Sequence, residues 1–190
     1  ACCFMFLFIG LFLDIFKWIF TNFTNPAWAE GLQVVPLLAL GNIFLGIYYN
    51  LSVWYKLTNK NKFGAMITIG GAIITIVLNI VLIPILHYTG AALATFCCYL
   101  FMMIASYKLG QKYYPVPYAV KKLISYIMLA VLIYLLHLLM VTWISAALWF
   151  SICTGLFLFG FFAWFVSKIE ASELAKFPFI GKYFTAGKAE

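Results

Sequence analysis

Residues 64–86 read GAMITIGGAIITIVLNIVLIPIL, a run that contains no charged side chain. Because about 20 apolar residues suffice for a helix to cross a bilayer, this stretch predicts a membrane-spanning helix. Similar runs predict further helices over residues 2–20, 33–55, 90–107, 123–142 and 146–167. None shows the alternation of polar and apolar residues that is typical of barrel strands. We therefore expect an all-α, polytopic transmembrane helix bundle of about six spans over residues 1–167.

The composition excludes a soluble globular domain. The 190-residue chain is 66% hydrophobic and 9% charged, and its mean hydropathy is +1.07. A soluble domain carries about 25% charged residues. The net charge of +7 comes from lysines in short gaps between apolar runs. Such a pattern indicates membrane topology rather than a nucleic-acid partner, so the expected partner is the lipid bilayer.

The positions of the lysines predict the orientation. The gaps 56–63 and 108–122 and the tail 168–190 hold eleven of the twelve lysines, and all three regions lie on one side of a six-span arrangement. The loops on the other side, 21–32, 87–89 and 143–145, hold none. Since lysine-rich loops stay inside, both chain ends and the tail are expected in the cytoplasm. The chain begins with Ala and lacks a basic leader, so we expect the C-terminal part of a longer protein.

Aromatic residues near the ends of the predicted spans support these boundaries. At the outer ends they are Trp18, Trp28, Trp143 and Trp149, and at the inner ends Trp54, Tyr55, Tyr113, Tyr114 and Tyr118. Such rings prefer the headgroup level of a membrane, so we expect them at the two interfaces.

The sequence offers no clustered catalytic set. It contains no arginine, and its two histidines, His87 and His137, have no acidic neighbour in sequence. The cysteines lack C-x-x-C spacing and are expected to act as small apolar residues: Cys2, Cys3, Cys97, Cys98 and Cys153. We therefore expect no enzyme, catalytic residue, metal or cofactor. His137 lies within a predicted span, where both a proton-relay role and a packed histidine stay open.

Three charged residues are candidates for function. Asp14 and Lys17 are three residues apart, a spacing that permits an ion pair on one helix face. An acidic residue within a membrane span is equally a functional hypothesis, and both readings stay open. Lys56 lies near the end of another span, where it could attract an anion.

Polar and small residues recur at helical spacing in three of the spans. One stripe contains Asn42, Gly46, Tyr49, Val53 and Lys56, with Asn50 beside it; the others contain Gly64, Thr68, Gly71, Thr75 and Asn79, and Ala91, Ala94, Cys98 and Ala105. Small residues let helices pack closely. Amides facing lipid are costly, so Asn42, Tyr49, Asn50 and Asn79 are candidates for lining a transport cavity or for bonding to neighbouring helices.

An ordered set of motifs resembles a known family. They are GIYYNLSVWYKLT at 46–58, NIVLIP at 79–84, TGAALAT at 89–95 and YKLGQKYYP at 107–115. Pro84 can end one helix and Gly90 can permit a tight reversal, so the middle motifs describe a hairpin. The set resembles the polysaccharide transporter family of the multidrug/oligosaccharidyl-lipid/polysaccharide exporter superfamily, over residues 30–130 most clearly.

The resemblance implies a function. Members have twelve to fourteen helices in two bundles around a central cavity, so these spans would be most of the second bundle and the N-terminal half of the same chain their partner. The implied activity is flipping a lipid-diphosphate-linked oligosaccharide, a precursor of lipopolysaccharide, O-antigen or capsule, across the bacterial cytoplasmic membrane by alternating access. Lys17 or Lys56 would attract the diphosphate, and coupling to H⁺ or Na⁺ stays open. The alternatives are a cation-coupled multidrug exporter of the same superfamily, an integral-membrane lipid-modifying enzyme and a structural membrane subunit.

Overall fold

The computed structural model describes residues 2–23, 31–113, 120–143 and 148–169, and over these ranges the chain is helical, without a strand. The expected all-α fold is therefore confirmed for this part of the chain. In chain order the elements are α1 (Cys2–Leu11), α2 (Leu13–Phe23), the 3₁₀ helix η1 (Leu32–Val34), α4 (Val35–Leu51), α5 (Val53–Leu57), α6 (Asn61–Tyr113), α7 (Val120–Trp143) and α8 (Leu148–Ile169). Residues 24–30, the tail 170–190, Trp28, Tyr114 and Tyr118 lie outside the described ranges.

Several of these helices are long and apolar enough to cross a membrane, which supports a membrane helix bundle. They are α6, α7, α8 and the segment from η1 to α5. The pair α1 and α2, bent by 47° between Leu11 and Leu13, is a further candidate for one broken span. This makes four spans, or five with the bent pair, among the described residues. The count of about six stays a prediction.

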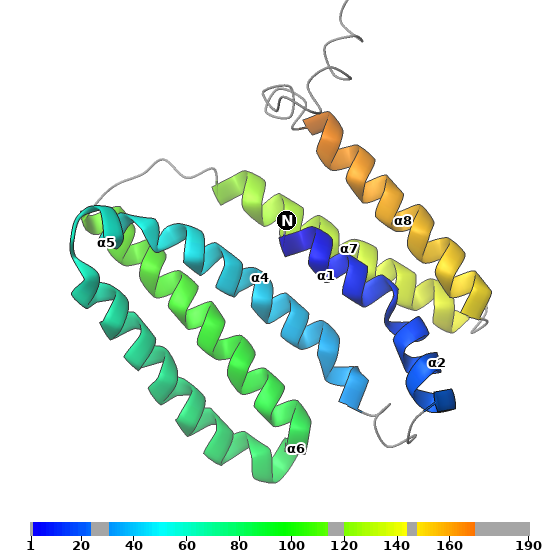
Figure 1. Ribbon diagram of the computed structural model, residues 1–190, viewed down its shortest axis with the longest axis horizontal. Helices are drawn as coiled ribbons and strands as arrows, with labels where there is room; N and C mark the ends of the chain where they lie inside the picture. Colours follow the sequence, from blue (N-terminus) through cyan, green and yellow to red (C-terminus); the bar gives the residue numbers. More distant parts are fainter. Residues whose placement is uncertain (1, 24–30, 114–119, 144–147, 170–190) are drawn as a thin grey trace, which may run out of the picture.

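The 53-residue helix α6 is a hairpin of two arms. Its backbone leaves helical geometry at His87 (φ 50°, ψ −126°), and the arms lie side by side in Figure 1. They contain the segments predicted over 64–86 and 90–107. Pro84 was expected to end the first arm, but it lies within the helix, and the reversal comes at His87. A proline gives up one backbone hydrogen bond and kinks a helix, but the reversal requires the positive φ that His87 adopts.

Gly90 was expected to permit the reversal of the hairpin, but its φ is not positive. A Cβ at Gly90 would lie 2.5 Å from the carbonyl oxygen of Leu82 and 3.0 Å from its Cβ. The missing side chain therefore permits the close approach of the two arms rather than the reversal itself. Further along, a Cβ on Gly71 would lie 3.0 Å from Met102 and 3.1 Å from Cys98, so the small-residue stripes of both arms pack against each other.

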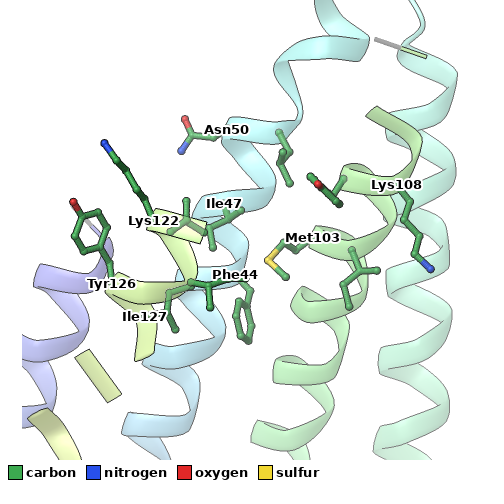
Figure 2. Close-up of a pocket in the computed structure, with 13 residues that line it drawn as sticks. Phe44, Ile47, Asn50, Met103, Lys108, Lys122, Tyr126 and Ile127 are labelled. Carbon is green, nitrogen blue, oxygen red and sulfur yellow. The ribbon is translucent and has the colours of Figure 1, made fainter. Parts of the chain in front are cut away.

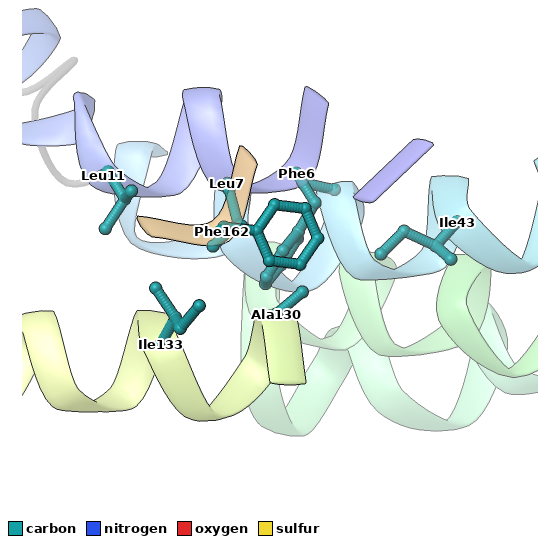
Figure 3. Packing of buried hydrophobic residues seen from close by; sticks show 8 residues of the cluster. Phe6, Leu7, Leu11, Ile43, Ala130, Ile133 and Phe162 are labelled. Atoms are coloured by element: carbon teal, nitrogen blue, oxygen red, sulfur yellow. The ribbon is translucent and has the colours of Figure 1, made fainter. Parts of the chain in front are cut away.

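A second packed group surrounds α1, which contacts α4, α7 and α8. Its core is drawn in Figure 3 and consists of Phe6, Leu7, Leu11, Ala39, Ile43, Ala130, Ile133 and Phe162. Phe4 meets Phe162 edge to face, with ring centroids 5.1 Å apart. Because α1 also packs on α4, it joins the α4–α6 group to the group formed with α7 and α8.

The aromatic residues divide into two kinds. Trp143 and Trp149 are 86% and 78% exposed, as residues at a membrane boundary can be. Trp54, by contrast, is only 2% exposed. Its indole lies against Gly110, where a Cβ would be 3.1 Å away, and stacks on Tyr113 with centroids 6.2 Å apart. Close helix packing at Gly110 therefore buries this ring within the bundle, and its place at the headgroup level stays a prediction.

The lysine-bearing helix ends gather at one end of the bundle. In Figure 1, α5, both ends of α6, the start of α7 and the end of α8 lie at the same end of the helices, and α2 lies at the other. The helices also extend further into the lysine-rich gaps than predicted: the connection between α5 and α6 covers only residues 58–60, and α6 continues to Tyr113. The arrangement agrees with the lysine pattern, and the orientation in a membrane stays a prediction.

Candidate functional site

A cavity of about 720 Å³ lies between α4, the second arm of α6 and the start of α7. Its walls are mainly apolar, and they include Phe44, Ile47, Met103 and Ile127 (Figure 2). The helical spacing of Met103, Ile104, Tyr107 and Lys108 places them on one face of α6. The start of α7 supplies the facing wall. The cavity is therefore an apolar groove between two helix groups rather than an enclosed polar chamber.

Polar groups are added to these apolar walls by three helices. Lys122 of α7, Lys108 of α6 and Asn50 of α4 are among the lining residues, and the ammonium ends of the two lysines point away from each other (Figure 2). All three side chains are exposed. The amide Nδ2 of Asn50 donates to the carbonyl oxygen of Gly46 at 3.3 Å, so its Oδ1 can accept another hydrogen bond. The cavity thus combines apolar walls with two cations and an amide.

Of the residues predicted to line a transport cavity, Asn50 alone lines this one. Asn42 and Tyr49 are exposed on α4, and Lys56 is exposed on α5, but none of them is among its lining residues. Asn79 lies partly buried on the first arm of α6, and its Oδ1 has no hydrogen-bond partner among the described residues. The structure therefore does not bring the four polar candidates together.

Lys108 and Lys122 were not predicted as site residues, because from the sequence they indicated only the membrane topology. Each lies next to the end of an apolar run, a position typical of boundary lysines. No local feature distinguishes a boundary lysine that faces a cavity. Only the packing of the α6 arm near α7 places both lysines along the same groove.

A second cavity, of about 500 Å³, lies where α2 bends away from α1 and faces α7 and α8. Asp14 and Lys17, which were singled out together in the sequence, both line it. Tyr134 and His137 line it from α7, and Ser151 lines it from α8. Charged and titratable groups from two helices therefore meet at the bend.

A chain of close polar contacts crosses this second site. Ser151 Oγ donates to Asp14 Oδ2 at 2.5 Å, and it lies 3.4 Å from His137 Nε2. The other ring nitrogen, Nδ1, lies 3.4 Å from Thr154 Oγ1. His137 and Ser151 are 4% and 3% exposed. Asp14, His137, Ser151 and Thr154 thus form one partly buried polar network, which we call the Asp14–His137 network.

Small residues let the helices approach at this network. A Cβ on Gly155 would lie 3.4 Å from the carbonyl oxygen of Leu11 and 3.9 Å from Cε1 of His137. A Cβ on Gly10 would lie 2.9 Å from the ring of Tyr134. Glycine at both positions therefore brings α1, α7 and α8 together just before the bend, and α2 then starts with Asp14 in its first turn.

Only part of this network was predictable from the sequence. Asp14 was a candidate, and a relay role for His137 was left open, but Ser151 and Thr154 were missed. Asp14 and Ser151 are 137 positions apart, and no spacing rule connects them. Within the described residues no group of three or more His, Cys, Asp or Glu side chains is placed to hold a metal ion.

Comparison with family models, with curated proteins and with solved structures found no match to this chain. The described chain is an α-helical bundle with helices of membrane-spanning length. It contains an apolar groove lined by two lysines and a partly buried network that joins an acid to a histidine.

Proposed function

We propose that the chain is part of a transporter in the bacterial cytoplasmic membrane that flips a lipid-diphosphate-linked oligosaccharide by alternating access. The observation that carries this proposal is the groove between α4, α6 and α7, which joins apolar walls to Lys108, Lys122 and Asn50. A prenyl-type lipid would contact the apolar walls. Its diphosphate would be attracted by the two lysines at the edges of the groove, which act as point charges toward phosphate.

The other polar groups of the groove suit the sugar. Asn50 supplies an amide, and Tyr107 and Tyr126 contribute phenol groups to the lining. Amide and phenol groups donate and accept hydrogen bonds, as sugar hydroxyls require. The groove therefore offers a separate contact for each of the three parts of the cargo: lipid, diphosphate and sugar.

The helix groups also suit alternating access. The α4–α6 group and the group of α7 and α8 meet mainly through α1, and the groove lies between them. Rocking of one group against the other would open and close the groove without covalent chemistry. In this proposal the N-terminal half of a longer chain forms the other bundle of the transporter.

Export in cells tests this function. In cells whose surface polysaccharide depends on this chain, the double variant Lys108→Glu, Lys122→Glu should reduce display by about tenfold or more, because two charge-assisted phosphate contacts become repulsive. Lys168→Glu is the matched control, since Lys168 lies over the ring of Trp164 on α8, outside the groove. Full display by the double variant at normal abundance would contradict the proposal.

A second candidate function is a cation-coupled exporter of apolar compounds. The observation that favours it is Asp14, an acid hydrogen-bonded inside the bundle, together with the largely apolar groove. A hydrophobic cationic dye separates the two functions. Charge reversal at Lys108 and Lys122 should strengthen the binding of such a dye and weaken that of a diphosphate lipid.

A further inference from the structure

We infer that Asp14 and His137, joined by the hydroxyl of Ser151, form a site that binds one exchangeable proton at the bend between α1 and α2. The inference deepens the proposed transport function and rests on it only for the role of the proton as a coupling ion. The site itself follows from the contacts of the Asp14–His137 network and can be tested without cargo.

The hydrogen bonds of the network indicate where a proton is held. Ser151 donates its hydrogen to Asp14, and Thr154 donates to the carbonyl oxygen of Phe150 at 2.8 Å. Each hydroxyl has a single hydrogen, so toward His137 both can only accept. When both hydroxyls donate in this way, the network can accept hydrogen bonds from both ring nitrogens, and a protonated His137 would be balanced by the carboxylate of Asp14.

Ser151 can pass the proton between the two groups without any other reactant. The Nε2–H bond of His137 breaks as its proton moves to Ser151 Oγ, and the proton of Ser151 moves to Asp14 Oδ2. The products are a neutral imidazole and a carboxylic acid, with the hydroxyl restored and its hydrogen now directed at Nε2. Loss of the shared proton leaves neutral His137 beside charged Asp14, so the site changes from net zero to a single negative charge.

The surroundings favour a proton as the bound ion. The titratable or charged groups that line this cavity are Asp14 and Lys17 from α2 and Tyr134 and His137 from α7. Ser151 and Thr154 of α8 and Gly10 and Leu11 of α1 are uncharged. A net charge on partly buried groups is costly, which favours a proton on the pair, and Lys17 lines the same cavity as Asp14.

The site lies where protonation can affect the fold. The bond from Ser151 to Asp14 ties the first turn of α2 to α8, immediately after the 47° bend. A carboxylate accepts this bond more strongly than a carboxylic acid does. Transfer of the proton from His137 to Asp14 therefore changes how firmly α2 is held after the bend, and broken helices are places where coupling ions bind in transporters.

Isotope labelling can observe this site alone. Asp14 is the single aspartate of the 190 residues, so a ¹³C-labelled aspartate carboxyl reports only this group. His87 is the other histidine, and a His87→Gln background makes ¹⁵N-histidine signals specific for His137. We would titrate both signals by NMR with the whole chain in phospholipid vesicles, with no cargo present.

The expected result is that the Asp14 and His137 signals change over one shared pH range, as coupled groups do. Asp14→Asn should move the midpoint of the His137 signal by about one pH unit or more. Ser151→Ala, which keeps both titratable groups and is the smaller change, should also move it. Ser167→Ala on the same helix is the control, because its hydroxyl donates to the carbonyl oxygen of Ala163 on its own helix.

His137 midpoints that are equal in Asp14→Asn, Ser151→Ala and the Ser167→Ala control would overturn the inference. A negative result in this titration does not affect the proposed role of the groove and its lysines. Failure of the charge-reversal experiment in cells removes the proposed cargo and leaves the proton site standing. The two proposals are therefore distinguishable.

Discussion

The carboxylate of Asp14 and the hydroxyl of Ser151 are 137 positions apart in the sequence and 2.5 Å apart in the structure. The contact joins α2, which follows the bend after α1, to the first turn of α8. His137 of α7 lies against the same hydroxyl. Three helices that share no local signal are therefore connected through one serine.

Loss of this hydroxyl should weaken the bundle. Ser151→Ala leaves the partly buried Asp14 carboxylate without its donor, which should lower stability by about 1–3 kcal/mol. The measurement is thermal unfolding in detergent. Ser167→Ala should stay close to the unsubstituted protein, and equal melting of the two variants would show that the contact contributes nothing to the fold.

The close packing between the two arms of α6 should not tolerate a larger side chain. Gly71→Leu places a side chain where Met102 and Cys98 already lie 3.0 and 3.1 Å from a Cβ, and should cost about 1–3 kcal/mol. Ala94→Leu, at a fully buried position, should behave alike. Gly160→Leu is the matched control on α8, since no atom lies within 4 Å of its Cβ position. Equal melting temperatures for Gly71→Leu and Gly160→Leu would contradict the packing.

The hairpin of α6 should gain from glycine at its reversal. His87 holds a φ of 50°, a backbone conformation that glycine adopts without steric cost. His87→Gly should therefore raise stability by up to about 1 kcal/mol, and His87→Val should lower it. The same unfolding assay ranks the three proteins. A more stable valine variant would be incompatible with the reversal at this residue.

Helix type was predictable from the sequence because membrane-spanning segments carry strong local signals in their length and apolarity. The interruptions of these helices were not predictable from the sequence. Residues 2–20 stay apolar across the bend between α1 and α2, and residues 33–55 stay apolar across the break at Ser52. Trp54 illustrates a different limit. An aromatic ring near a span end suits both a headgroup region and a packed contact, and only Gly110 on another element decides between them.

The groove and the Asp14–His137 network each contain residues that stand out in the sequence and residues that do not. Asn50 and Asp14 stand out within apolar runs, where an amide or an acid is costly. Lys108 and Lys122 resemble any boundary lysine, and Ser151 resembles any small helical residue. Tertiary packing places Lys108 and Lys122 along the groove between α4, α6 and α7. It also places Ser151 beside Asp14 of α2.

Topology can be tested at the connection between α5 and α6. Lys60→Cys, in a chain whose five cysteines are replaced, should react with a membrane-impermeant reagent only after the cells are opened, because the lysine-rich side is expected inside. A cysteine at Trp143 serves as the control for the opposite side and should react in intact cells. Labelling of position 60 from outside would reverse the orientation.

We propose that the groove between α4, α6 and α7 binds a lipid diphosphate. Photo-crosslinking of the chain in vesicles, with a prenyl diphosphate that carries a photoreactive group on its lipid, tests this binding. We expect crosslinks at groove residues such as Phe44 and Met103, reduced about tenfold or more by the double variant Lys108→Glu, Lys122→Glu and unchanged by Lys168→Glu. Crosslinks that fall outside the groove, or that both lysine variants leave equally strong, would contradict it.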